Sequence, residues 1–142
     1  MKKFKIFTDG ASRGNPGHSA AAFVIQTDDG VIWVQDGCYI GQVTNNVAEY
    51  TAVKLALQRL IGDFAKHLPA EVEFVADSML IASQLAGKFK IKQPHLMALW
   101  QEIKQLEPQA GQVTYTYTPR ANNFLADKLA NNAIDNHLAS ND

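Results

Sequence analysis

The sequence has 142 residues, of which 46% are hydrophobic and 19% are charged, and this composition excludes a disordered or fibrous chain. The net charge is −1, so the whole chain lacks the basic footprint that nucleic-acid binders usually carry. We expect a single domain over residues 1–142, in which 139–142 form a disordered polar tail.

Two further features indicate where the chain works. The basic start at residues 1–7 is not followed by an apolar stretch long enough for a signal peptide or a membrane span, so we expect a cytoplasmic protein with no membrane partner. The single cysteine, Cys38, cannot form an internal disulfide and is expected to be a buried, inert thiol.

The first third of the chain predicts three β-strands in succession. Residues 3–8 alternate polar and apolar side chains, and residues 20–26 form an apolar run. The tripeptide Asp28-Asp29-Gly30 marks a tight turn, and residues 31–40 then complete an antiparallel meander.

The remainder of the chain alternates helical and strand patterns. Apolar residues recur at helical spacing from Thr44, a predicted N-cap, to Phe64. The elements that follow are a strand at 72–76, a short helix at 78–87 with Ser78 as its predicted N-cap, an amphipathic helix at 94–108, a strand at 113–118 and a final helix from 125 onward. Pro108 is expected to stop the amphipathic helix, because proline lacks a backbone N–H.

The resulting element order is β-β-β-α-β-α-α-β-α, which predicts an α/β protein of the mixed α+β kind. A meander followed by β-α units gives a five-stranded mixed sheet with helices on both faces, not a doubly wound parallel sheet. The sequence contains no internal repeat, low-complexity tract or linker.

Four acidic residues occupy positions from which they can converge. Asp9 and Asp77 each end a predicted strand, Glu49 lies one turn into the long helix, and Asp127 lies near the start of the last helix. Groups at the ends of neighbouring strands face a common crevice. Four carboxylates in one crevice need cations to neutralise them, and oxygen-only ligands select hard ions such as Mg²⁺ or Mn²⁺.

Each of these acids also has a simpler explanation. An Asp at a strand end or a helix start is often a cap, and a Glu inside a helix is usually solvated. Other carboxylates, such as Asp28, Asp36, Asp63 and Glu73, are equally available. The flanking residues therefore have to decide between the two interpretations.

These flanks contain four motifs: residues 8–17 (TDGASRGNPG), 44–49 (TNNVAE), 77–78 (DS) and 119–127 (PRANNFLAD). In this order they resemble the signature of the type 1 ribonuclease H (ribonuclease HI) family, and the likeness covers nearly the whole chain. Residues 87–92 (GKFKIK) resemble a segment of the small bacterial and archaeal-type members, which lack the family's longer basic protrusion.

The resemblance implies a ribonuclease H-like fold and endonucleolytic hydrolysis of the RNA strand of RNA/DNA hybrids. Asp9, Glu49, Asp77 and Asp127 would bind two Mg²⁺ or Mn²⁺ ions, with the backbone of Gly10 as a further ligand. In this two-metal mechanism one ion activates water and the other stabilises the departing 3′ oxygen, which leaves 5′-phosphate and 3′-hydroxyl ends.

The resemblance also implies a set of substrate contacts, with the backbone of a glycine-rich turn at residues 10–17 close to the nucleic acid. The implied contact residues are Ser12, Arg13, Asn15, Asn45, Asn46, Ser78, Lys90, Lys92, Arg120 and Asn123. They would recognise the hybrid independently of its sequence, through phosphates and the RNA 2′-hydroxyl. The spacing of nucleotide-binding loops is absent, so no nucleotide cofactor is expected, and we expect a monomer.

Two departures from the family pattern stand near Asp127. No histidine lies between Thr118 and Asp127, where several members carry one that assists proton transfer. Arg120 occupies this loop and can hold a phosphate, but it cannot shuttle a proton near neutral pH. Phe124 is either a core residue or an exposed residue used for stacking on a base or for contact with a partner.

Two rival functions remain open. A non-catalytic hybrid-binding module would keep the fold and the groove, but the presence of all four carboxylates argues against it. An exonuclease of the same superfamily would also gather acids around two metals, although the Asp9-Gly10 and Asn45-Asn46 contexts favour ribonuclease H.

Overall fold

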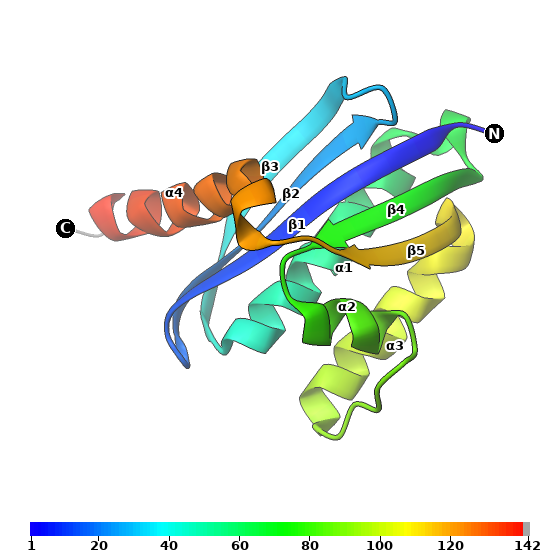
Figure 1. Cartoon of the computed structure of the whole chain (residues 1–142). Helices are drawn as coiled ribbons and strands as arrows, with labels where there is room; N and C mark the ends of the chain where they lie inside the picture. Colours follow the sequence, from blue (N-terminus) through cyan, green and yellow to red (C-terminus); the bar gives the residue numbers. More distant parts are fainter. Residues whose placement is uncertain (141–142) are drawn as a thin grey trace.

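The structure is a computed structural model that describes residues 1–140. In this part of the chain, five strands form one sheet and four α-helices pack on it (Figure 1). The strands are β1 (Lys3–Gly14), β2 (Gly17–Thr27), β3 (Ile32–Val43), β4 (Ala70–Ala76) and β5 (Gly111–Tyr117). The helices are α1 (Asn45–Asp63), α2 (Met79–Leu85), α3 (Pro94–Ala110) and α4 (Phe124–Ser140), with short 3₁₀ turns η1 (Ala65–His67) and η2 (Arg120–Asn122).

The strand order β3-β2-β1-β4-β5 confirms the predicted mixed sheet. β1 pairs with β2 and β2 with β3 in the antiparallel sense, as the meander predicts. β4 runs parallel to β1, and β5 runs parallel to β4. The central strand β1 therefore has an antiparallel neighbour on one side and a parallel neighbour on the other.

Helices cover both faces of the sheet, again as predicted (Figure 1). Helices α1, α2 and α3 share one large core with the strands, in which Phe4 and Ile6 of β1 and Phe74 of β4 lie against Tyr50 and Leu57 of α1. All five side chains are almost completely buried, so this core supplies most of the hydrophobic stabilisation.

Helix α4 packs on the opposite face through a second, smaller core. Ala20 and Ala22 of β2 contact Ala130 and Ile134 of α4. Small residues let the helix lie close to the strands: a Cβ atom added to Gly37 of β3 would lie 2.4 Å from the carbonyl oxygen of Leu129. The position of α4 thus depends on the buried side chain of Ile134 and on close backbone approach.

Two predicted helix caps are present, and both lie next to an acidic residue of interest. The Thr44 side chain accepts a hydrogen bond of 3.3 Å from the backbone N–H of Val47 at the start of α1. The Ser78 side chain accepts one of 3.3 Å from the N–H of Ile81 at the start of α2. These caps satisfy backbone donors that would otherwise be unpaired.

The glycine-rich segment 10–17 is not a turn over its whole length, so that expectation is wrong. β1 and β2 stay paired from Phe4↔Thr27 to Gly14↔Gly17, and only the two residues between Gly14 and Gly17 form the turn. Strand pairing therefore takes up the backbone groups on the β2 side of the segment, whereas the pairing of β1 with β4 ends at Thr8.

Three other expectations are also wrong. Helix α3 continues through Pro108 to Ala110, since a proline in the last turn removes only one helical hydrogen bond. Cys38 is exposed, because it lies on the outermost strand β3. Residues 139 and 140, predicted as tail, belong to helix α4, and 141–142 lie outside the described residues. Within residues 1–140, none of the helices is both long and apolar enough to cross a membrane.

The close approach of α4 to β3 gives a testable prediction. Gly37→Ala is expected to lower the free energy of unfolding by about 1–3 kcal/mol, because its Cβ would overlap the Leu129 backbone. Gly62→Ala is the matched control: its Cβ meets nothing within 4 Å, and alanine in a helix adds about 0.5–1 kcal/mol. Urea denaturation measures both changes, and a Gly37→Ala protein as stable as the wild type would contradict the packing described.

Candidate metal centre

Three of the four predicted acids meet at one end of the sheet. Asp9 of β1, Glu49 of α1 and Asp77 after β4 each offer a carboxylate oxygen, and these three oxygens all lie within 4.8 Å of one another. Thr8 and Ala76 are register partners in the parallel β1–β4 pair. The residue that follows each of these two in the chain is an aspartate, so the strand register itself places Asp9 beside Asp77.

Glu49 reaches this pair because α1 lies very close to β1. A Cβ atom on Gly10 would lie 2.3 Å from the carbonyl carbon of Ala48 and 2.4 Å from the backbone nitrogen of Glu49. Only glycine permits this approach. The Asp9-Gly10 dipeptide thus supplies one carboxylate and makes room for the element that carries the next.

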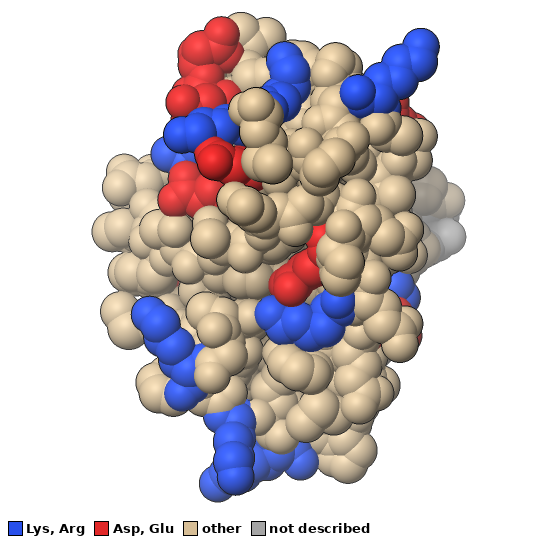
Figure 2. Space-filling view, turned by 90° about the vertical axis from the view of Figure 1, so that its right-hand side faces the viewer, with Lys and Arg blue, Asp and Glu red and all other residues tan. Residues whose placement is uncertain are grey.

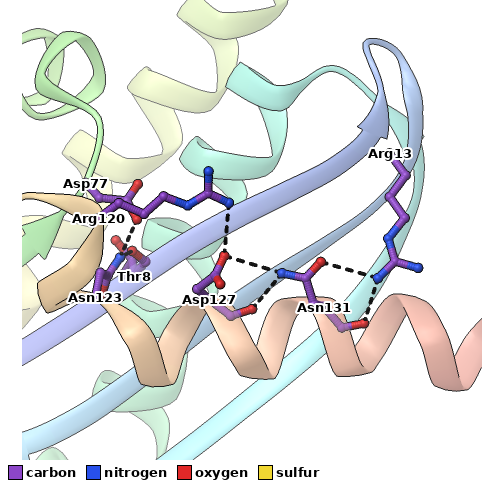
Figure 3. Close-up of polar contacts among 7 residues, drawn as sticks. All are labelled: Thr8, Arg13, Asp77, Arg120, Asn123, Asp127 and Asn131. Carbon is purple, nitrogen blue, oxygen red and sulfur yellow. Dashed lines mark hydrogen bonds and ion pairs between the residues drawn. The ribbon is translucent and has the colours of Figure 1, made fainter.

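The fourth acid, Asp127, lies at the side of this cluster, in the first turn of α4. Asp127 lines the same cleft as the other three acids, and it contributes to the raised pKa of Asp9. Figure 3 shows Asp127 pointing away from α4, with Arg120 of η2 above it at 3.5 Å and Asn131 beside it on the next turn. The structure therefore brings all four predicted acids to one place.

The electrostatics of the cluster indicate a missing positive charge. Burial, followed by the nearby carboxylates of Glu49 and Asp77, raises the pKa of Asp9 to about 9. Burial and the charge of Asp77 raise the pKa of Glu49 to about 8. Both shifts have the sign expected when a carboxylate loses water and gains like-charged neighbours.

The hydrogen bonds of Glu49 point to the same conclusion. Its Oε2 atom is buried and has no hydrogen-bond partner among the described residues. A buried polar atom without a partner is costly in a folded protein. A divalent cation would both pair with this oxygen and neutralise the cluster, and an all-oxygen ligand set suits Mg²⁺ or Mn²⁺. The residues present therefore fit a hard metal ion.

The acids lie in an open cleft of about 670 Å³. It is lined by Asp9, Gly10, Ala11, Ser12, Arg13, Gly14, Asn15, Asn45, Glu49, Asp77, Ser78, Arg120, Asp127 and Asn131. Six of the predicted substrate contacts are in this lining: Ser12, Arg13, Asn15, Asn45, Ser78 and Arg120. Segments that are distant in sequence form the walls, namely the β1–β2 hairpin, the start of α1, the β4–α2 junction, η2 and the first half of α4.

The polar wall residues already hold one another in place. The Asn15 side-chain oxygen accepts a hydrogen bond of 3.0 Å from the backbone N–H of Asn45, which ties the hairpin tip to α1. The Ser12 hydroxyl contacts the carbonyl oxygens of Gly14 and, at 3.0 Å, Val43. The cleft is thus a structured wall with backbone and side-chain groups fixed in position.

Asn123 has a different place from the one predicted. It is 1% exposed, so its expected contact with substrate is wrong. Its side-chain nitrogen donates hydrogen bonds of 2.8 Å to the carbonyl oxygen of Thr8 and 3.1 Å to Asp77 Oδ2 (Figure 3). Asn123 lies beneath the cluster and holds Asp77 in place, because η2 turns its side chain inward.

Asn46, Lys90 and Lys92 are outside the cleft lining. The two lysines lie in the exposed segment 86–93 between α2 and α3, at the lower end of the molecule in Figure 1. Basic side chains without acidic neighbours gather at this same end in Figure 2, while most acidic groups on that face lie at the opposite end. The basic segment is therefore a separate surface, and its contact with phosphates stays a prediction.

Asn131 lines the cleft but was missed from the sequence. Its position four residues after Asp127 was the available signal, because residues i and i+4 of a helix are neighbours on one face. Phe124, which was predicted as either core or surface, is 66% exposed at the start of α4.

Comparisons with known proteins agree with this geometry. The family model described as "Reverse transcriptase-like" matches residues 7–133. The ribonuclease HI of Halobacterium salinarum is 39% identical over 129 residues, which are 91% of this chain and 63% of that protein. A crystal structure of LC11-RNase H1 in complex with an RNA/DNA hybrid has a TM-score of 0.91 and 38% identity, and the match covers 95% of this chain and 99% of that one. The chain belongs to the ribonuclease HI family.

The ribonuclease HI relatives differ in length. A bifunctional protein of Mycobacterium tuberculosis is 37% identical over 134 residues, which are 94% of this chain but only 36% of that protein. The chain thus spans about a third of the mycobacterial relative. A structure of that protein's N-terminal RNase H domain has a TM-score of 0.90 and 35% identity to this chain, and the match covers 100% of both chains.

The raised pKa of Asp9 predicts how stability depends on pH without cations. The pKa of Asp9 is about 9 in the folded protein and 3.8 ordinarily. The neutral Asp9 side chain therefore contributes fully to the free energy of unfolding below about pH 4, and this contribution is lost as the pH rises toward 9. Asp9→Asn should therefore raise the melting temperature in EDTA at pH 8 by on the order of 5 °C, and by less at pH 5. Circular dichroism melts check this, with the exposed Asp28→Asn as the control. An equal gain at both pH values would contradict it.

A second prediction concerns Mg²⁺ binding. A cation must displace protons from Asp9 and Glu49, whose pKa values are about 9 and 8, so the apparent Mg²⁺ affinity should rise from pH 6 to pH 9. One displaced proton changes the affinity by about tenfold per pH unit. Calorimetry in two buffers of different ionisation enthalpy measures the protons released. Affinity that is independent of pH, with no proton release, would be incompatible with the raised pKa values.

Proposed function

We propose that this protein is a metal-dependent endonuclease that hydrolyses the RNA strand of RNA/DNA hybrids. The observation that carries the proposal is the convergence of Asp9, Glu49 and Asp77 in the floor of an open, polar cleft. Family membership and the likeness to a ribonuclease H structure that contains a hybrid support the same activity.

In the proposed site, Asp9, Glu49, Asp77 and Asp127 hold two divalent ions, Mg²⁺ or Mn²⁺. The unpaired Oε2 of Glu49 and the mutual repulsion of the acids support this ligand set. The backbone of Gly10 lies in the cleft lining beside them and is proposed as a further ligand. Bound ions would supply a water of lowered pKa and would stabilise negative charge on the phosphate and the leaving oxygen.

The overall reaction is a phosphodiester hydrolysis. A bond forms between the water oxygen and phosphorus, and the bond between phosphorus and the 3′ oxygen breaks. The water gives up a proton and the 3′ oxygen acquires one, which leaves 5′-phosphate and 3′-hydroxyl ends. Arg120, which is 80% exposed beside Asp127, is placed to hold a phosphate oxygen at the mouth of the cleft and cannot carry the proton.

Recognition of the hybrid would rest on polar groups of the cleft wall. Ser12, Asn15, Asn45 and Ser78 line the cleft with hydroxyl and amide groups, and such groups suit the 2′-hydroxyl that distinguishes RNA from DNA. Lys90 and Lys92 are exposed on the separate basic segment, where they would contact phosphates further along the duplex. Neither group reads base identity, so binding is proposed to be independent of sequence.

Several expectations stay predictions. The cytoplasmic location, the monomeric state, the absence of a nucleotide cofactor and the single-domain organisation belong to the proposal, and each requires its own measurement on the purified protein or in cells.

The decisive experiment incubates the purified protein with Mg²⁺ or Mn²⁺ and an RNA/DNA hybrid labelled in the RNA strand. We expect internal cuts in the RNA only, and Asp9→Asn or Asp77→Asn should reduce the rate by about 1,000-fold or more, because each removes a metal ligand worth several kcal/mol to the transition state. Asp28→Asn, an exposed acid outside the cleft, serves as the matched control. Binding without cleavage under either metal would identify a binding module, and stepwise cutting of single-stranded DNA from its ends would identify an exonuclease.

A further inference from the structure

Asp127 is held by its surroundings differently from the other three acids. Its side chain remains 30% exposed, and its Oδ1 atom receives donors from two sides. Asn131 Nδ2 lies 3.3 Å from this oxygen and also donates a hydrogen bond of 3.0 Å to the Asp127 backbone carbonyl. The Asn131 amide therefore bridges the carboxylate and the helix backbone one turn away (Figure 3).

The orientation of the Asn131 amide is fixed in turn by Arg13. Arg13 reaches from the end of β1 to α4, where its Nη2 atom lies 3.3 Å from Asn131 Oδ1 and 3.4 Å from the Asn131 carbonyl oxygen. Its Nη1 atom lies 2.5 Å from Asp135 Oδ1, one turn further along α4. Because a guanidinium can only donate, it holds the amide oxygen toward itself and leaves the amide nitrogen facing Asp127.

We propose that Asn131 and Arg13 form a positioning relay that aims the carboxylate of Asp127 at the metal centre. The proposal rests on the proposed function, since it assigns a role within the same site. Asn131 acts through its hydrogen bond to Asp127, and Arg13 acts through Asn131. The role differs from the phosphate contact expected for Arg13, because both of its terminal nitrogens already contact α4.

Asp127 requires a partner that fixes the orientation of its side chain. Asp9, Glu49 and Asp77 are confined by strand register and helix packing, whereas the Asp127 side chain, in the first turn of α4, remains 30% exposed. A partly exposed carboxylate in that position has several rotamers available. Outer partners that orient a metal ligand typically affect metal affinity by 10- to 100-fold when removed, so a donor one turn away is expected to matter.

Asparagine suits this position because it is a donor on one side and an acceptor on the other. An aspartate at position 131 would repel Asp127, and a leucine of similar size would form a hydrogen bond with neither Asp127 nor Arg13. The adjacent Asn132 is exposed on the same helix and lines no part of the cleft. The pair Asn131→Leu and Asn132→Leu therefore separates the relay from a general change in helix α4.

The first test measures Mn²⁺ binding to the full chain by calorimetry, with no nucleic acid present. We expect Asn131→Leu and Arg13→Gln each to weaken Mn²⁺ binding by about tenfold, and Asn132→Leu to leave it unchanged. Thermal melts in EDTA establish that each variant is folded. Unchanged Mn²⁺ binding in a folded Asn131→Leu protein would overturn the relay. Weaker hybrid binding with unchanged Mn²⁺ binding in Arg13→Gln would reduce Arg13 to a phosphate contact and also contradict it.

A second measurement uses the unaltered protein and so does not depend on any variant folding. In a ¹⁵N-labelled sample, the side-chain amide signals of Asn131 should shift on addition of Mg²⁺ while those of Asn132 stay in place. Signals of Asn131 that ignore Mg²⁺ would contradict the relay. Failure of the proposed function would look different: metal binding and its dependence on Asn131 would persist while no RNA strand is cut.

Discussion

Mutual repulsion among three carboxylates is the constraint around which this fold is organised. Two unit charges 4 Å apart interact by about 4 kcal/mol at an effective dielectric of 20, and a whole domain is stable by only about 5–15 kcal/mol. Asp9, Glu49 and Asp77 are nevertheless held with oxygens within 4.8 Å of one another. The rest of the structure must impose that arrangement, and without a cation the repulsion is relieved by protonation of Asp9 and Glu49, whose pKa values are raised to about 9 and 8.

Backbone geometry and a large hydrophobic core hold the three carboxylates in this arrangement. Parallel pairing of β1 with β4 places two aspartates at adjacent strand ends, and the contact of Gly10 with Ala48 and Glu49 fixes α1 against β1. Behind this contact, α1 contributes Tyr50, Leu57 and other buried side chains to the core. Movement of Glu49 away from the aspartates would open that core, so hydrophobic burial opposes the repulsion directly.

Sequence reasoning identified the features that depend on local pattern. The order of elements, the caps Thr44 and Ser78 and the convergence of the four acids all follow from periodicity, from cap chemistry or from motifs. It failed where a distant partner decides the outcome. The pairing of β1 with β2 up to Gly14 depends on the opposite strand, and the burial of Asn123 depends on Thr8, 115 positions away in sequence. The exposure of Cys38 follows from the edge position of β3, which a sequence pattern does not reveal.

The β1–β2 hairpin tip has contacts on both sides of the cleft. Asn15 of the tip accepts a hydrogen bond from the first residue of α1, and Arg13 donates hydrogen bonds to α4. Among residues 1–140, the turn at Asp28 to Gly30, at the other end of β2, forms hydrogen bonds only within its own hairpin and with β1. Tolerance to inserted residues is governed by the bonding of the affected backbone and not by the mere presence of a turn. The two turns that flank β2 should therefore have diverged differently in evolution: the distal one is free to vary in length, while added residues at the tip would disturb both walls at once.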